Sequence, residues 1–103
     1  MLVNAERLIG RFEQQPRERK RYRVDFRQHL ADGETVLIPT FEVTPVTVPP
    51  LQITDVALGP DADQLLMFVE GGLDGITYQV TMLTVTSDTQ ELEDELEFRI
   101  REF

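Results

Sequence analysis

The residues best suited to chemistry lie in the stretch VDFRQHLADGETV, residues 24–36, which holds the only histidine of the chain among acidic neighbours. A histidine oriented by a carboxylate can act as a general base, and Asp25 or Asp32 could orient His29 in a small hydrolase. Asp25 is four residues from His29, a spacing that brings side chains together on a helix but not on a strand. No Ser or Cys stands in an elbow of the GxSxG type. We therefore expect an exposed or locally hydrogen-bonded imidazole and no catalytic residue.

Metal and cofactor sites are not indicated either. The chain has no cysteine and one histidine, which disfavours a thiolate or imidazole site. The segment DADQLLMFVE lacks the DxDxDG order of a calcium loop, and GGLDG is neither GxGxxG nor a P-loop. The carboxylates of residues 91–97 would share one solvated face of a strand. The sequence thus predicts no metal site and no cofactor.

A strand should carry the first half of the opening stretch. In RYRVDF, the residues Tyr22, Val24 and Phe26 alternate with charged residues and so should face a core. The turn signal Asp32-Gly33 follows, where glycine can adopt a positive φ. Tyr22, Phe26 and Gly33 are therefore predicted to have structural roles.

The later segments also have the residue patterns of β-strands, up to the C-terminus. Pro39 lies inside an extended run, which predicts an edge strand, a bulge or a break. In ITYQVTMLTVT, residues 76–86, the apolar positions change phase midway, which predicts a β-bulge. Residues 88–103 fit a helix or a strand. Because the apolar residues from Leu96 to Ile100 alternate strictly, we favour a strand that pairs with residues 76–86.

These segments indicate a single all-β domain. About seven short strands separated by turn signals predict an immunoglobulin-like β-sandwich, which would span residues 20–103. Residues 1–19 would form an extended N-terminal arm, because Gly10 ends any short helical turn and the polar segment EQQPRER carries Pro16. The length of 103 residues and the hydrophobic content of 41% suit one packed domain.

Four more residues around the sixth strand are predicted to have structural roles. Tyr78 stands near the start of that strand, as does the tyrosine corner of immunoglobulin-like sandwiches. Its ring should fill core, and its hydroxyl should bond back to a nearby backbone group. Gly71, Gly72 and Gly75 would supply positive φ angles in the tight turn before it.

The net charge of −9 is unevenly distributed along the chain. Residues 1–27 hold eight basic and four acidic residues, whereas residues 28–103 hold two basic and fifteen acidic ones. A basic arm could bind an acidic partner or another copy of the chain. The residues predicted to bind partners are Arg7, Arg11, Arg17, Arg19, Lys20, Arg21 and Arg23. Nucleic acid is disfavoured because the acidic remainder would repel phosphates, and no apolar run is long enough for a membrane span.

A family resemblance makes the expectation more specific. The segments YRVDF, LADGET, VPPL, GGLDGITYQVT and TSD, in this order, resemble those of small virion proteins of tailed bacteriophages and prophages. The similarity covers about residues 12–100. The family comprises fiber-tail adaptors or related head-tail structural proteins with an immunoglobulin-like β-sandwich. Phe41 stands where this family often has Trp, and Thr89 stands where it has Gly.

The resemblance implies a non-enzymatic structural protein of the virion. It would be an adaptor in the neck or tail region that connects tail or portal to fibers, present in several symmetric copies. Its partners would be portal, tail or fiber subunits and neighbouring copies of itself, and it would be made in the host bacterial cytoplasm. The arm would order on assembly, and Leu66 with Phe68, or Leu83 with Val85, could form part of a permanent contact. The alternative is a capsid decoration or carbohydrate-contacting domain.

Overall fold

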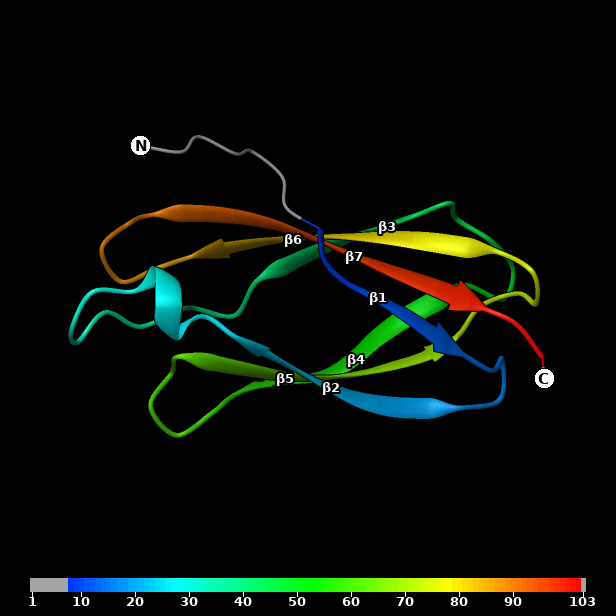
Figure 1. Ribbon diagram of the computed structural model, residues 1–103, viewed down its shortest axis with the longest axis horizontal. Helices are drawn as coiled ribbons and strands as arrows, with labels where there is room; N and C mark the ends of the chain where they lie inside the picture. The colour runs from blue at the N-terminus through cyan, green and yellow to red at the C-terminus, as the bar shows by residue number, and fades with distance from the viewer. Residues whose placement is uncertain (1–7, 103) are drawn as a thin grey trace.

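The computed structural model describes residues 8–102, which form seven strands in two layers (Figure 1). One sheet has the strand order β1-β7-β6-β3 and the other has the order β2-β5-β4. The elements are β1 (Leu8–Gln14), β2 (Arg19–Asp25), the short 3-10 helix η1 (Arg27–His29), β3 (Thr40–Thr44), β4 (Leu51–Leu58), β5 (Gln64–Gly71), β6 (Thr77–Val85) and β7 (Glu91–Ile100). The predicted all-β sandwich is confirmed, and the ambiguous C-terminal segment is a strand that pairs with β6.

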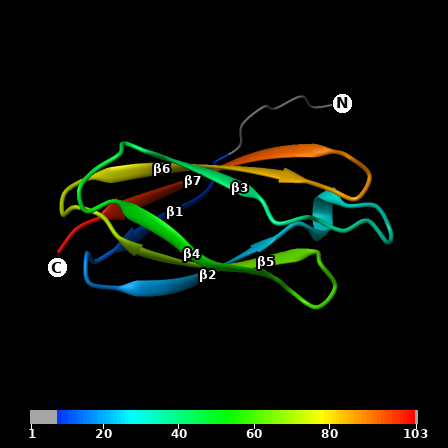
Figure 2. The same ribbon diagram turned by 180° about the vertical axis from the view of Figure 1, so that it is seen from behind.

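The strand order supports the immunoglobulin-like prediction. Strands β2, β5 and β4 share one sheet and β3, β6 and β7 the other, which is the distribution found in immunoglobulin-like sandwiches. The edge strands β1 and β2 lie on one side of the sandwich, nearest the viewer in Figure 1. The edge strands β3 and β4 lie on the other side, nearest the viewer in Figure 2.

The core lies between the two layers and follows the predicted alternation. Val24 and Phe26 are buried and Tyr22 is half-buried, while the charged residues between them, Arg23 and Asp25, are exposed. The apolar side chains that are almost fully buried are Phe26, Val36, Leu65, Met67, Val69, Tyr78, Val80, Met82, Leu96, Phe98 and Ile100.

The structure corrects the expected N-terminal arm. Residues 8–14 are strand β1, which pairs in parallel with β7. The pairing satisfies backbone polar groups along β1, and the ring of Phe12 packs on Tyr22 and Phe98, with centroid distances of 4.9 and 5.3 Å. The domain therefore starts before residue 20. Of the seven basic residues predicted to bind partners, Arg7 alone lies outside the described part of the chain.

Two local expectations have opposite outcomes. The break at Pro39 is confirmed, because Val36 forms only an isolated bridge and β3 begins at Thr40 as an edge strand. The predicted bulge in residues 76–86 is wrong, because the register between β6 and β7 is continuous. Thr84 keeps the alternation by being buried, so its neighbours on β6 face outward.

Tyr78 and the glycines before it form one packed corner. The hydroxyl of the fully buried Tyr78 accepts a hydrogen bond from the Leu73 N–H at 2.8 Å and contacts the Thr47 hydroxyl at 2.6 Å. Gly71 and Gly72 have φ angles of +81° and +89°, which side chains rarely adopt. A Cβ on Gly71 would lie 2.6 Å from a backbone oxygen, so the turn requires glycine there.

The buried carboxylate of Glu34 joins LADGET to the turn between β6 and β7. It accepts hydrogen bonds from the Thr86 hydroxyl at 2.5 Å, the Gln90 amide at 2.8 Å and the Ala31 N–H at 2.8 Å. These bonds, above all the one from Thr86, hold the pKa of Glu34 below its usual range. Two segments that carry the family resemblance therefore bind each other, and their shared role is to shape the fold.

We expect Glu34→Gln to make the chain less sensitive to acid. Because the pKa of Glu34 is lower in the folded chain, its contribution to stability is present at neutral pH and is lost as the pH falls below about 4. Denaturant titrations between about pH 7 and about pH 3 should show a destabilisation that shrinks towards the acid end. Asp32→Asn, an exposed change in the same loop, is the control. A pH-independent difference for Glu34→Gln would contradict this role.

Thr89 adopts a φ of +64° in the turn between β6 and β7, the position where the family resemblance leads one to expect glycine. A β-branched residue in this region is strained, so Thr89→Gly should raise the free energy of unfolding by about 0.5–1 kcal/mol. Equilibrium denaturation measures the change. Asp88→Gly, at an ordinary φ in the same turn, should lower stability. The strain argument fails if both changes destabilise equally.

Candidate protein-binding surface

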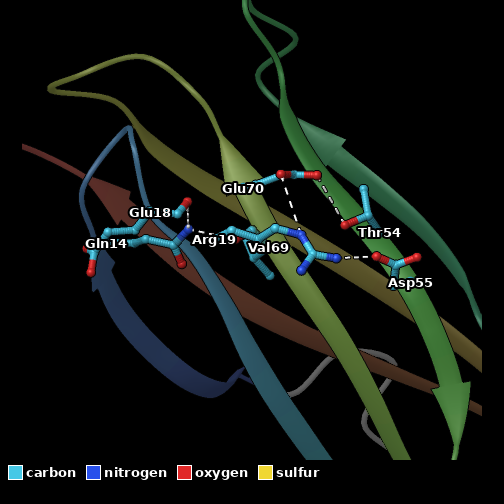
Figure 3. A network of polar contacts seen from close by, with 7 residues as sticks. All are labelled: Gln14, Glu18, Arg19, Thr54, Asp55, Val69 and Glu70. Atoms are coloured by element: carbon cyan, nitrogen blue, oxygen red, sulfur yellow. Dashed lines mark hydrogen bonds and ion pairs between the residues drawn. The ribbon is translucent and has the colours of Figure 1, made fainter.

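The buried side chain of Gln14 joins β1 to β2, which are consecutive strands in different sheets. Its Nε2 donates to the backbone oxygens of Glu18 and Val69, at 3.0 and 2.7 Å (Figure 3). Its Oε1 accepts a hydrogen bond from the Tyr22 hydroxyl at 2.9 Å. Both donors and the acceptor of the amide are thus used, and the start of β2 is held against β5.

Arg19 extends from β2 across β5 to β4 on the outer face of the sheet (Figure 3). Its guanidinium lies 3.8 Å from the ring centroid of Phe68. It pairs with Asp55, and its Nε lies 3.7 Å from Oε2 of Glu70. The other carboxylate oxygen of Glu70, Oε1, accepts a hydrogen bond from the Thr54 hydroxyl at 3.2 Å. Arg19 is therefore neutralised within the chain and serves to cover Phe68.

Other basic side chains on and beside β2 remain available to a partner. Lys20 lies 3.6 Å from Glu18, but Arg17, Arg21 and Arg23 are exposed and form no ion pair within residues 8–102. Residues 17–27 together hold six basic and two acidic residues, a net charge of +4. Unpaired arginines on a rigid strand can bind carboxylates with bidentate geometry. This makes β2 the candidate protein-binding surface.

The outer face of the other sheet is acidic. Alternation along β7 turns its glutamates outward while Asp94, Leu96 and Phe98 are buried, so the predicted row of solvent-facing carboxylates is confirmed. The acidic residues of this face are Glu13, Glu42, Glu91, Glu93, Glu95 and Glu97, and its basic residues are Arg11 and Arg99. The charge is thus divided between two faces of one sandwich, which corrects the expected division between an arm and a body.

His29 shares a hollow with one of the two aspartates that are candidates to orient it. It is exposed and lines a hollow of about 190 Å³ together with Asp25 and Asp94, whereas Asp32 lines a different hollow. The carboxylate of Asp25 is held by Arg27, whose Nε and Nη2 donate at 2.7–3.1 Å. These bonds keep the pKa of Asp25 below its usual range. The described residues that line the hollow include no Ser, Thr or Cys.

The remaining predictions concern metals, membranes and turns. Within residues 8–102, no group of three or more His, Cys, Asp or Glu is arranged to hold a metal ion. The same part of the chain has no helix long and apolar enough to cross a membrane. Gly33 and Gly75 adopt φ angles of +80° and +86°, as their predicted roles in turns require.

Sequence analysis missed Gln14 and Asp94, although both are buried. Gln14 stands in the polar segment EQQPRER, where no apolar alternation indicates a strand. Its main partner, the Val69 carbonyl, is 55 residues away in the sequence. Asp94 does occupy an inward position of the alternation, and the period of β7 could have found it.

A comparison with protein families matches residues 14–100 to the family described as podophage GP4 fiber-tail adaptor protein gp77. The chain belongs to this family of phage fiber-tail adaptors. The match begins at Gln14 and runs to the end of β7, so it includes the whole of β2 and the acidic row of β7. No curated protein matches the chain. As a fiber-tail adaptor it has a structural role in the tail region of a phage virion, and its partners are other virion proteins.

We expect Gln14→Leu to lower the free energy of unfolding by roughly 2 kcal/mol, because it leaves two backbone oxygens and the Tyr22 hydroxyl without their partner. Equilibrium denaturation would measure this loss. Gln15→Leu, one residue later and half-buried, should change stability by no more than about 0.5 kcal/mol. Equal effects of the two substitutions would show that the Gln14 amide does not hold the junction.

Proposed function

We propose that this fiber-tail adaptor connects tail or portal to fibers in the neck or tail region, as a non-enzymatic component present in several symmetric copies. It is made in the host bacterial cytoplasm and enters the particle by binding portal, tail or fiber subunits and neighbouring copies. The observation that carries the proposal is that three exposed arginines on and beside β2, Arg17, Arg21 and Arg23, form no ion pair within the described residues. The chain that carries them belongs to an adaptor family.

The basic surface is ordered before any partner binds. Residues 8–14 belong to the sandwich, and Gln14 holds the start of β2, so the arginines project from a fixed backbone. Preorganisation lowers the conformational entropy lost on docking. This replaces the expectation that residues 8–19 order only on assembly. An acidic surface of a neighbouring virion subunit is the chemistry that pairs with Arg17, Arg21 and Arg23.

We expect the double substitution Arg21→Glu and Arg23→Glu in the phage to prevent incorporation of the adaptor and, with it, of the fibers. Both side chains are exposed, so the purified variant should keep its fold while its binding charge is reversed. Mass spectrometry of purified particles would measure the adaptor and fiber content, and infectivity would fall in parallel.

Arg99→Glu is the matched control for this experiment. Arg99 is an exposed arginine on β7, in the sheet that does not contain β2. Its reversal should leave the adaptor content of particles close to the wild-type value. Normal adaptor and fiber content in particles that carry the β2 double variant would show that β2 is not the binding surface.

A further inference from the structure

Charged and apolar residues form a paired pattern on the outer face of the sheet that contains β2. Arg21 is directly opposite Phe68, and Arg23 is directly opposite Leu66, on the adjacent strand β5. Residues directly opposite in an antiparallel pair lie on the same face. The arginines are exposed, and Leu66 and Phe68 are half-buried. These four residues are called the basic patch: two arginines on one strand beside two apolar side chains on the next.

The other outer face carries the same arrangement with the opposite charge. Glu93 is directly opposite Leu83, and Glu91 is directly opposite Val85, where β7 pairs with β6. Leu83 is 36% exposed, Val85 is half-buried, and neither glutamate forms an ion pair within the described residues. These four residues are called the acidic patch. They are also the outward-facing residues of β6 and β7 that lie nearest the turn between these strands.

The geometry points to docking of the basic patch of one copy on the acidic patch of a second copy, which would name one partner of the β2 surface proposed above. Residues two apart on a strand are separated by about 7 Å, so two arginines can meet two glutamates in step. The adjacent strand, about 4.8 Å away, then brings Leu66 and the part of Phe68 that Arg19 leaves exposed onto Leu83 and Val85. Each charge finds a counter-charge, and each apolar pair is removed from water.

The two patches lie on opposite faces of the sandwich, since β2-β5 and β6-β7 belong to different sheets. A contact between two different surfaces is heterologous. In a docked pair, one copy therefore keeps a free acidic patch and the other keeps a free basic patch, and each free patch can bind a further copy. Repetition builds a ring where the rotation closes. Several symmetric copies would therefore assemble because every chain carries both a basic patch and an acidic patch.

The test is sedimentation velocity of the purified chain at about 0.05 M and about 0.5 M salt. We expect self-association at low salt that is lost at high salt. The basic-patch variant with Arg21→Glu and Arg23→Glu, and the acidic-patch variant with Glu91→Arg and Glu93→Arg, should each weaken association on the order of tenfold or more. The chain with all four substitutions, which has the wild-type net charge, should regain it. Glu13→Arg, on the acidic face but on β1, should have little effect.

The outcomes separate this inference from the adaptor function. A chain that remains monomeric at low salt, or a fourfold variant that does not regain association, overturns the docking of copies. If that result is accompanied by loss of the β2 double variant from phage particles, the adaptor function stands and its acidic partner is a different virion protein. If association follows the charge pattern but particles incorporate the β2 double variant normally, the copies dock as inferred and the proposed role of β2 in the particle is wrong.

Discussion

The buried amide of Gln14 is the interaction on which both outer faces of this sandwich depend. The chain leaves one sheet at Gln14 and enters the other at Arg19. Between the two sheets there is no strand pairing to supply backbone hydrogen bonds, and the side-chain amide of Gln14 supplies them instead. An unpaired buried polar group costs about 1–3 kcal/mol, which favours one register at this crossing. A slip of β2 by one residue would turn Tyr22 and Val24 outward and its arginines into the core. The position of the basic surface is therefore a consequence of core hydrogen bonding.

Glu34 has the corresponding role at the opposite end of the sandwich. Its carboxylate ties the loop after η1 to the turn between β6 and β7, and so it holds the end of the acidic row on β7. With both ends tied by buried polar groups, the sandwich forms a rigid body that carries positive charge along β2 and negative charge along β7. That polarity suits a structural adaptor, which must bind neighbours in a defined orientation.

Alternation in the sequence predicted the strands whose inward residues are apolar, and it failed where a polar residue points inward. The period of Leu96 to Ile100 identified β7 correctly. In β6 the apolar residues Leu83 and Val85 face outward on either side of the buried Thr84, so the change of phase that predicted a bulge has another cause. β1 was missed because Gln14 is satisfied by distant groups that a linear pattern does not contain. The sequence correctly predicted separate basic and acidic regions, but it assigned them to an arm and a body instead of to two faces of the sandwich. Charge counted along a chain cannot show which face of a strand each side chain occupies.

The central claim is that the outer face of β2 is buried against an acidic surface in the assembled phage tail. A cryo-electron microscopy reconstruction of the tail at side-chain detail tests it most directly. We expect the sandwich at the tail vertex, with Arg21 and Arg23 within hydrogen-bonding distance of carboxylates from a neighbouring subunit. A β2 face open to solvent, with the adaptor held through the opposite edge formed by β3 and β4, would contradict this.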